Sequence, residues 1–437
     1  MNCNNYILSP GFIDLQINGC HGIDFSNPSL SQEDVIQVME VLPMYGVTSF
    51  CPTIISSSRK LYRRNIDIIG NLCFQHQNDG QGGNNDDDDD SSDCDHGQNG
   101  EYNNNNKGGA KILGLHLEGP FFAKSKKGAH DAKFIQETIN MSILSNTYSQ
   151  KQLQEKNNNI IKIITMAPEL NGSLSVIQSL TKEYNIVVSM GHTDATFEEG
   201  VDGVRNGATL ITHLFNAMKP FHHREPGLLG LLQHTNDEES NSLTKQQQYQ
   251  HEQNEKGNDS TSNTTRTSFS NPYFSIIVDG LHSHPAAVKM AYNLNPEKLI
   301  LVTDAMSAMG LGDGIHSLGS MSVTIQNDTS KNKSKSSNNK RKATITGTDI
   351  LAGSIVSMDT CIQNLVKFTS CSVKNAIKAA TIHPARVLKM DKYIGSISVG
   401  SYADLVLLDD DLNVVKTFVN GRLVYDGVRK SSRKRKL

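Results

Sequence analysis

The sequence predicts an α/β protein built on a (β/α)8 barrel of the TIM type. Eight short β-rich runs recur along the chain, and most are apolar throughout, as in parallel strands covered on both faces. Helix-like segments separate several of these runs. Polar residues follow the ends of many runs, which is where catalytic residues gather in such a barrel. A doubly wound open sheet is the alternative, and the polar strand ends favour the barrel.

The predicted strands share a short apolar centre bounded by glycine or polar residues. They are GFIDLQI (11–17), VTSFCPT (47–53), KILGLHLEG (111–119), IIKIITMAPE (160–169), NIVVSMGHT (185–193), ATLITHLFN (208–216), FSIIVDGLH (274–282) and LILVTDAM (299–306). Between them, SQEDVIQVMEVLPMYG (31–46) and DATFEEGVDGVRNG (194–207) have the spacing of amphipathic helices. Ser31 is the predicted N-cap of the first, because its hydroxyl can accept from a free backbone N–H.

The 437 residues suffice for one large domain with an appendage, although only 37% are hydrophobic. The deficit lies in three polar tracts, 76–109, 235–271 and 328–342, which have too few apolar side chains to offset the entropy cost of ordering. We expect disordered insertions there, within a catalytic barrel over 9–390. Residues 1–8 and 391–427 are predicted to form a remnant β-sandwich that is short of amino-terminal strands, and 428–437 a basic tail.

Charge and hydropathy exclude several functional classes. The net charge of −3 provides no field for nucleic acid, and no apolar run is long enough to span a membrane. The seven cysteines form no CxxC pair, and no signal peptide is recognisable, which predicts a cytoplasmic protein. The basic tail leaves a nuclear location as the alternative.

Four residues at strand ends point to chemistry: Glu118, His192, His213 and Asp304. Two imidazoles and a carboxylate are a common ligand set for a catalytic divalent ion, with one position open for water. A further carboxylate nearby can take a proton from that water and deliver it to a leaving group. Each residue alone is most simply a hydrogen-bonded polar group. Four of them at one barrel mouth favour a metal-dependent hydrolase.

Around these residues the chain resembles the N-acetylglucosamine-6-phosphate deacetylases of the amidohydrolase superfamily. The motifs that carry the resemblance are PGFIDLQINGCHG, GLHLEGPF, KKGAH, GHTDAT, THLFNAMKPFHHREPGLLG, DGLH, VTDAM, LAGS and HPA. They cover most of residues 7–427 outside the tracts, and THLFNAM followed by REPG is the most specific. The resemblance implies hydrolysis of N-acetyl-D-glucosamine 6-phosphate to D-glucosamine 6-phosphate and acetate, in amino-sugar catabolism or recycling.

The resemblance also implies roles for individual residues. Glu118, His192 and His213 match the metal ligands, and Asp304 matches the catalytic base that activates the metal-bound water. His130 matches the imidazole that polarises the acetyl carbonyl. The residues that match substrate-binding positions are Ala129, His130, Asn216, Ala217, Arg224, His282, Leu351, Ala352 and Gly353. Arg224 suits the 6-phosphate, since a guanidinium can bind two phosphate oxygens. A phosphosugar substrate and a homodimer are therefore expected.

The first predicted strand departs from the pattern of many metal-dependent hydrolases, which carry His-x-His there. Gln16 and Asn18 occupy the two positions, and neutral amides are poor ligands for a zinc-like ion. We therefore expect one divalent ion per active site, with Gln16 and Asn18 as hydrogen-bonding groups behind its ligands. Zinc suits the ligand set best, and Fe, Co or Mn are alternatives.

Two other functions stay open. The protein could be another amidohydrolase that acts on a different acylated amine or a cyclic amide. It could also be a non-catalytic descendant that binds a sugar phosphate. The intact set of Glu118, His192, His213 and Asp304 argues against the second alternative.

Overall fold

The structure, a computed structural model, describes residues 6–79, 108–148, 150–154, 160–232, 270–327 and 341–427. Within these residues, eight parallel strands pair in the order β12-β11-β10-β9-β8-β7-β5-β2. They are β2 (Phe12–Ile17), β5 (Val47–Ile55), β7 (Leu115–Glu118), β8 (Ile161–Met166), β9 (Val187–Met190), β10 (Leu210–Ile211), β11 (Tyr273–Ile276) and β12 (Leu299–Leu301), and β6 (Lys111–Ile112) also pairs with β5. Every predicted strand run overlaps one of them, with β5 ending two residues after its predicted run and β11 beginning one residue before its run. The predicted barrel is therefore confirmed.

The sheet closes where the chain beyond β12 meets β2. The Asp304 N–H donates to the carbonyl of Gln16 at 2.8 Å, and the Asn18 N–H donates to the carbonyl of Ala305 at 2.7 Å. These bonds join the carboxyl ends of the first and last strands. They also bring Gln16 and Asn18 beside Asp304, although almost 300 residues separate them in sequence.

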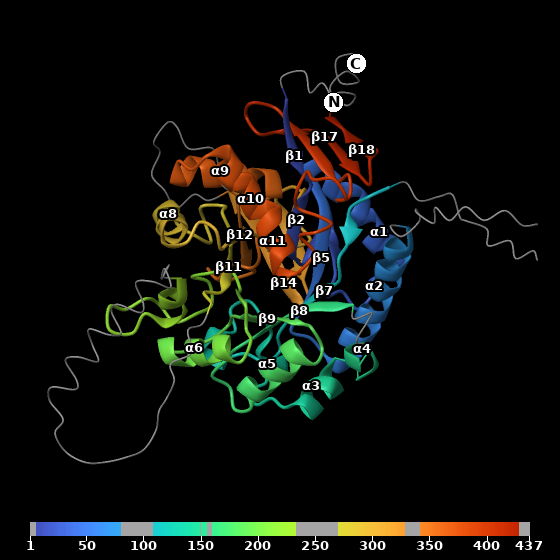
Figure 1. Ribbon diagram of the computed structural model, residues 1–437. Coiled ribbons are helices and arrows are strands. Elements are labelled where there is room, and N and C mark those ends of the chain that lie inside the picture. Colours follow the sequence, from blue (N-terminus) through green and yellow to red (C-terminus); the bar gives the residue numbers. More distant parts are fainter. Residues whose placement is uncertain are drawn as a thin grey trace, which may run out of the picture.

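Helices lie around the strands of the barrel, as the labelled elements in Figure 1 show. They are α1 (Gln32–Val41), α2 (Arg59–Asp79), α3 (Met141–Thr147), α4 (Gln150–Gln154), α5 (Ser173–Lys182), α6 (Phe197–Arg205), α8 (Pro285–Leu294), α9 (Met358–Thr369), α10 (Val373–Ala380) and α11 (Ile382–Val387). The predicted cap is confirmed, because the Ser31 side chain accepts from the Asp34 N–H and the Asp34 side chain accepts from the Ser31 N–H. All residues of β2 and β5 are buried, which explains why apolar residues occur on both faces of these strands instead of alternating with polar ones.

A three-stranded antiparallel sheet lies at the catalytic side of the barrel. It consists of β13 (Gly314–Leu318), β14 (Met321–Asn327) and β15 (Arg341–Ile345). Its apolar residues join a small separate core with Ile55 and Met306. The two-residue strands β3 (Gly19–Cys20) and β4 (Ile23–Asp24) lie below it, and the buried Asp24 carboxylate accepts from the Gly319 N–H in the β13–β14 turn. Asp24 therefore fastens this hairpin to the barrel.

The predicted β element outside the barrel is one four-stranded antiparallel sheet, β1-β16-β17-β18. Its strands are β1 (Ile7–Pro10), β16 (Leu405–Leu408), β17 (Val414–Val419) and β18 (Arg422–Asp426), at the top of Figure 1. Residues 9 and 10 thus belong to β1 and not to the barrel, where the predicted border at residue 9 placed them. Because β1 pairs with β16, the amino-terminal segment covers one edge of the carboxy-terminal strands.

Most of the predicted insertions, at 80–107, 233–269 and 328–340, lie outside the described residues, as does the predicted basic tail at 428–437. Their predicted borders are too wide. Residues 76–79 continue α2, and Arg341 and Lys342 open β15, where they pair with Asn327 and Gln326. Arg341 also forms an ion pair with Asp313 at 2.7 Å, a partner that a local composition argument could not find.

No helix in the described ranges combines the length and the apolar character needed to cross a membrane. The cytoplasmic location stays a prediction.

Candidate active site

The four strand-end residues predicted to carry chemistry meet at the carboxyl end of the barrel. Glu118 is the last residue of β7, and His192, His213 and Asp304 follow β9, β10 and β12 within three residues. The last three have φ angles of 50°, 30° and 46°, which non-glycine residues rarely adopt. Such backbone strain clusters at functional sites, where the surrounding structure holds it.

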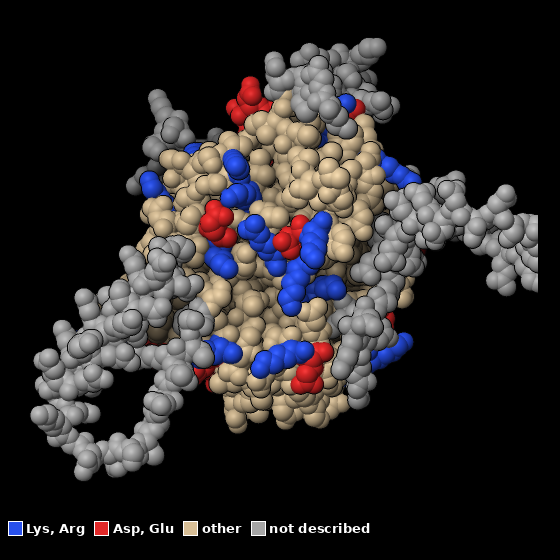
Figure 2. Space-filling view, in the orientation of Figure 1, with Lys and Arg blue, Asp and Glu red and all other residues tan. Residues whose placement is uncertain are grey.

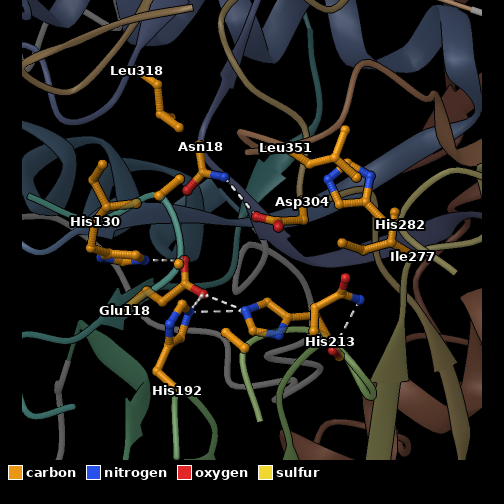
Figure 3. Close-up of a pocket in the computed structure, with 16 residues that line it drawn as sticks. Asn18, Glu118, His130, His192, His213, Ile277, His282, Asp304, Leu318 and Leu351 are labelled. Atoms are coloured by element: carbon orange, nitrogen blue, oxygen red, sulfur yellow. Dashed lines mark hydrogen bonds and ion pairs between the residues drawn. The ribbon is translucent and has the colours of Figure 1, made fainter. Parts of the chain in front are cut away.

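Glu118, His192 and His213 form the only group of three or more potential metal ligands found in the described part of the chain. Their ligand atoms all lie within 4.8 Å of one another, and all three residues are buried. The Nε2 atoms of His192 and His213 lie 3.3 and 3.0 Å from Glu118 Oε1, and 3.1 Å from each other (Figure 3). His192 Nδ1 lies 2.9 Å from the Lys126 carbonyl, so Nδ1 donates and Nε2 is left free to bind an ion.

The electrostatics of this cluster fit a divalent cation. Burial opposes ionisation of Glu118, but hydrogen bonds from His192 and His213 outweigh it and hold the pKa of Glu118 well below its ordinary value. Burial lowers the pKa of His192. Burial also acts to lower the pKa of His213, but its hydrogen bond to Glu118 prevails and raises that pKa. An ionised carboxylate and two converging imidazole nitrogens are the state that metal binding requires, once a cation replaces the imidazole proton.

Asp304 faces this cluster without belonging to it. Its Oδ1 accepts from Asn18 Nδ2 at 2.7 Å and from Gln16 Nε2 at 3.3 Å. Gln16 Nε2 also donates to Glu118 Oε1 at 2.9 Å. Burial, and then the charge of Glu118, raise the pKa of Asp304 to about 7. A carboxyl group with this pKa can both accept and donate a proton near neutral pH. Gln16 and Asn18 thus donate to the carboxylates of the site, and Asn18 also lines the cavity.

His130 enters the same cavity in one defined tautomer. The backbone N–H of Ser56 donates to His130 Nδ1 at 3.2 Å, and the Ser56 hydroxyl lies 2.9 Å from the same nitrogen. Because the N–H can only donate, the neutral ring carries its proton on Nε2. Burial, and then the charge of His192, lower the pKa of His130 to about 3, so the ring is neutral near pH 7. His130 Nε2 lies 3.9 Å from Glu118 Oε2, at the edge of the cluster. His130 therefore presents a neutral N–H donor to the cavity.

The cavity at this end of the barrel has a volume of about 140 Å³. It brings together most residues predicted to bind metal or substrate, namely Asn18, Glu118, Ala129, His130, His192, His213, Asn216, Ala217, His282, Asp304, Leu351 and Gly353. Two predicted substrate-binding residues do not line it. Arg224 lies on an exposed turn, and Ala352 is buried in the small core beneath the three-stranded sheet.

Several residues of the site were missed by the sequence analysis. Ser56 orients His130, and Asp279 accepts from His282 Nδ1 at 2.7 Å, which leaves His282 Nε2 for the cavity. Burial opposes ionisation of Asp279, but this hydrogen bond lowers its pKa overall. Asp279 stands in the DGLH motif, so a carboxylate three residues before a site histidine was the available signal. Leu318, the last residue of β13, also lines the cavity, and nothing local in the sequence marks it.

Comparison with known proteins agrees with this geometry. A family model described as "Amidohydrolase family" matches residues 105–424. The chain belongs to the amidohydrolase family. This amidohydrolase is 36% identical to N-acetylglucosamine-6-phosphate deacetylase from Danio rerio, with 97% of this chain and 86% of that protein covered. It is 35% identical to the enzyme of the same name from Homo sapiens, with 97% and 85% covered. The crystal structure of N-acetylglucosamine-6-phosphate deacetylase from Thermotoga maritima superposes on this amidohydrolase with a TM-score of 0.70, at 29% identity and with 97% and 90% of the chains covered.

Proposed function

We propose that this amidohydrolase removes the acetyl group from N-acetyl-D-glucosamine 6-phosphate, giving D-glucosamine 6-phosphate and acetate, in the breakdown or recycling of amino sugars. The observation that carries the proposal is the cluster of Glu118, His192 and His213 facing Asp304 across one buried cavity. It occurs in a chain that is 36% identical, along 97% of its length, to a protein named for this reaction.

Glu118, His192 and His213 would hold one divalent ion, with zinc the best match to two imidazoles and a carboxylate and with Fe, Co or Mn as alternatives. Such an ion, when bound, supplies a Lewis acid that polarises the acetyl carbonyl and acidifies water. Gln16 and Asn18 support a count of one. The amide NH2 group of Gln16 donates to Glu118 and Asp304, and that of Asn18 donates to Asp304. The amide oxygens that remain are neutral and are poor ligands for a second zinc-like ion.

Asp304 acts as the general base and then as the general acid. Its carboxylate takes a proton from the attacking water while the water oxygen forms a bond to the acetyl carbon. It then gives that proton to the sugar nitrogen as the C–N bond breaks, so that the amine leaves neutral together with acetic acid, which releases its own proton to water and becomes acetate. The pKa of about 7 allows both transfers near neutral pH, and Asn18 holds the carboxylate in place.

His130 stabilises the oxyanion that develops on the acetyl oxygen. Its Nε2–H faces the cavity because Nδ1 is occupied by the Ser56 N–H. A neutral donor held by a backbone bond requires little reorganisation when charge develops. His282 and Asn216, which also line the cavity, would contact the sugar hydroxyls, and Asp279 holds the His282 ring in orientation.

Arg224 would bind the 6-phosphate in a homodimer. It lies on an exposed turn beside Phe221, whose side chain is 59% exposed. A second copy that covers Phe221 would shield this turn from water and strengthen a guanidinium–phosphate contact. Light scattering of the purified full chain tests the dimer, and a monomeric active enzyme would contradict it.

The decisive experiment measures acetate release from N-acetylglucosamine 6-phosphate and from unphosphorylated N-acetylglucosamine. We expect kcat/KM to be at least about 100-fold higher for the phosphate ester, since a bidentate arginine–phosphate contact contributes about 3 kcal/mol. The variant Arg224→Gln should remove most of this preference, whereas Lys60→Gln, at an exposed position on α2, should not. Equal hydrolysis of the two sugars would overturn the substrate, and a metal content near two ions per chain would overturn the single site.

A further inference from the structure

A second cavity lies at the opposite end of the barrel, away from the cluster of Glu118, His192 and His213. Its volume is about 220 Å³. Lys162, Val187 and Tyr273 line it from the first or second positions of β8, β9 and β11, and Thr209 from the residue before β10. The cavity is therefore at the amino ends of these strands. The segment from Arg386 to Lys389, at the end of α11, forms another wall.

The charged side chains that line this cavity, among the described residues, are three cations and no carboxylate: Lys162, Arg386 and Lys389. Lys298 adds a fourth cation nearby, with its ammonium 4.2 Å from the centre of the Tyr273 ring. Figure 2 faces the side of the molecule that carries α11, and Lys and Arg side chains gather at the centre of this face with a few acidic ones beside them. Glu297, whose charge acts on Tyr273, is paired with Lys378 at 3.3 Å.

Of the three cations that line the cavity, Lys162 has the fewest polar contacts. It is partly buried, and burial lowers its pKa, yet its ammonium forms no hydrogen bond or ion pair with any described residue. Arg386 likewise has no carboxylate partner in the described ranges and only interacts with the Tyr273 hydroxyl. Lys389 donates to the Asn185 side chain at 2.7 Å. None of the three cations forms an ion pair with a carboxylate among the described residues, although Asp391 and Glu297 lie near enough to affect Tyr273. An anion placed between the cations would therefore be bound favourably.

The floor of the cavity is built to hold the Lys162 stem. Gly114 has a φ of +140°, and a side chain at this position would collide with Cγ of Lys162. The glycine lets the stem lie directly against the backbone before β7. The remaining walls are apolar or carry hydroxyls, with Ile186, Val387 and Leu388 among them. This combination suits an organic ligand with a charged end and a small uncharged body.

We propose that this cavity, at the amino end of the barrel, binds a small phosphate monoester whose phosphate lies between Lys162, Arg386 and Lys389. A phosphate offers three acceptor oxygens and up to two negative charges, which match three cations that line one cavity better than a single carboxylate does. The site is separate from the catalytic cavity, because β8 alone places six residues, roughly 20 Å, between the two ends. It does not depend on the proposed deacetylase activity.

Calorimetric titration of the full chain with glycerol 2-phosphate tests the site, in an Arg224→Gln background that weakens phosphate binding at the catalytic end. We expect saturable binding of one molecule per chain. Lys162→Met and Arg386→Gln should each weaken binding about tenfold or more, since each removes a charge-assisted hydrogen bond. Lys60→Gln is the matched control, because it removes one exposed positive charge at the catalytic end of the barrel and should leave binding unchanged. Succinate, a dicarboxylate, should bind more weakly.

Three results would overturn the proposal: no saturable binding at millimolar concentration, equal binding by the Lys162→Met and Arg386→Gln variants, or equal weakening by Lys60→Gln. Tighter binding of succinate would overturn the phosphate class. Arg386 is exposed, so its variant keeps the test valid if Lys162→Met fails to fold. Acetate release by these variants with Arg224 intact separates this test from that of the proposed function.

Discussion

At the carboxyl ends of the barrel strands, His192, His213 and Asp304 all have positive φ angles, whereas at the amino ends Lys162 and Tyr273 lie within regular strands. The carboxyl end gathers imidazoles and carboxylates that contact one another, while the amino end gathers cations that lack acidic partners among the described residues. The first arrangement brings groups of different pKa within proton-transfer distance. The second creates a field of one sign. The same eight strands therefore support chemistry at one end and, on our proposal, only binding at the other.

The largest expected effect is the loss of catalysis in Asp304→Asn. The amide cannot take a proton from water, so kcat should fall by about 100- to 10,000-fold. The ligands Glu118, His192 and His213 are unchanged, so metal content measured by mass spectrometry should be retained. Glu118→Gln is the contrasting variant and should lose the metal. Retained activity in Asp304→Asn would remove this residue from the role of base.

Asn18→Leu should have a smaller effect on the same carboxylate. Loss of a hydrogen bond that holds a site residue typically reduces activity by about 10- to 100-fold. The Asn18 hydrogen bond favours the ionised form of Asp304, so its removal should raise the pKa of Asp304 further. The acidic limb of the kcat/KM profile should then move to higher pH. An unmoved limb would show that Asn18 does not act through Asp304.

Asp24→Asn tests the hairpin that covers the catalytic end. Burial raises the pKa of Asp24 from 3.8 to about 6. Its proton therefore contributes stability that is fully present below the unfolded pKa of about 4 and is lost as pH rises through about 6. The free energy of unfolding of the wild type, relative to the variant, should fall by about 2 kcal/mol between about pH 4 and about pH 7. Urea unfolding at several pH values measures this, and a constant difference would refute it.

The smallest effect is expected at the amino end. Lys162→Met should leave kcat and KM for the phosphosugar within about twofold of the wild type, because substitutions that are remote from the reacting groups rarely affect them. Steady-state acetate release measures both constants. A tenfold loss of kcat with unchanged metal content would show that the two ends of the barrel are coupled. It would contradict the view that one end serves catalysis and the other only binding.

The residues at the catalytic end could be located from the sequence because the carboxyl ends of parallel barrel strands lie at one edge. Once GHT and TDA were read as the ends of buried strands, His192 and Asp304 had to meet at one edge. Gln16 and Asn18 were placed for the same reason. Their contacts with Asp304 follow from barrel closure, which a strand-by-strand prediction implies without specifying the partners.

The remainder depended on contacts that no local pattern records. The Ser56 N–H is invisible to residue-type arguments, because every residue except proline has one. Asp279 belongs to the DGLH motif, but the motif alone does not show that its carboxylate accepts from the His282 ring. Leu318 reaches the cavity only because the hairpin folds back over the barrel, and β1 pairs with β16 across the whole length of the chain. Long-range pairing, rather than composition, decides these positions.

The bond from the Ser56 backbone to His130 has a consequence for evolution. A main-chain N–H cannot be lost by substitution to any residue but proline, and it does not titrate in the physiological range. The Ser56 hydroxyl also lies 2.9 Å from His130 Nδ1, but the backbone N–H alone is enough to keep the imidazole proton on Nε2. The backbone just after β5 therefore fixes which ring nitrogen of His130 donates. A substitution can remove His130, but few substitutions elsewhere would move its proton to Nδ1.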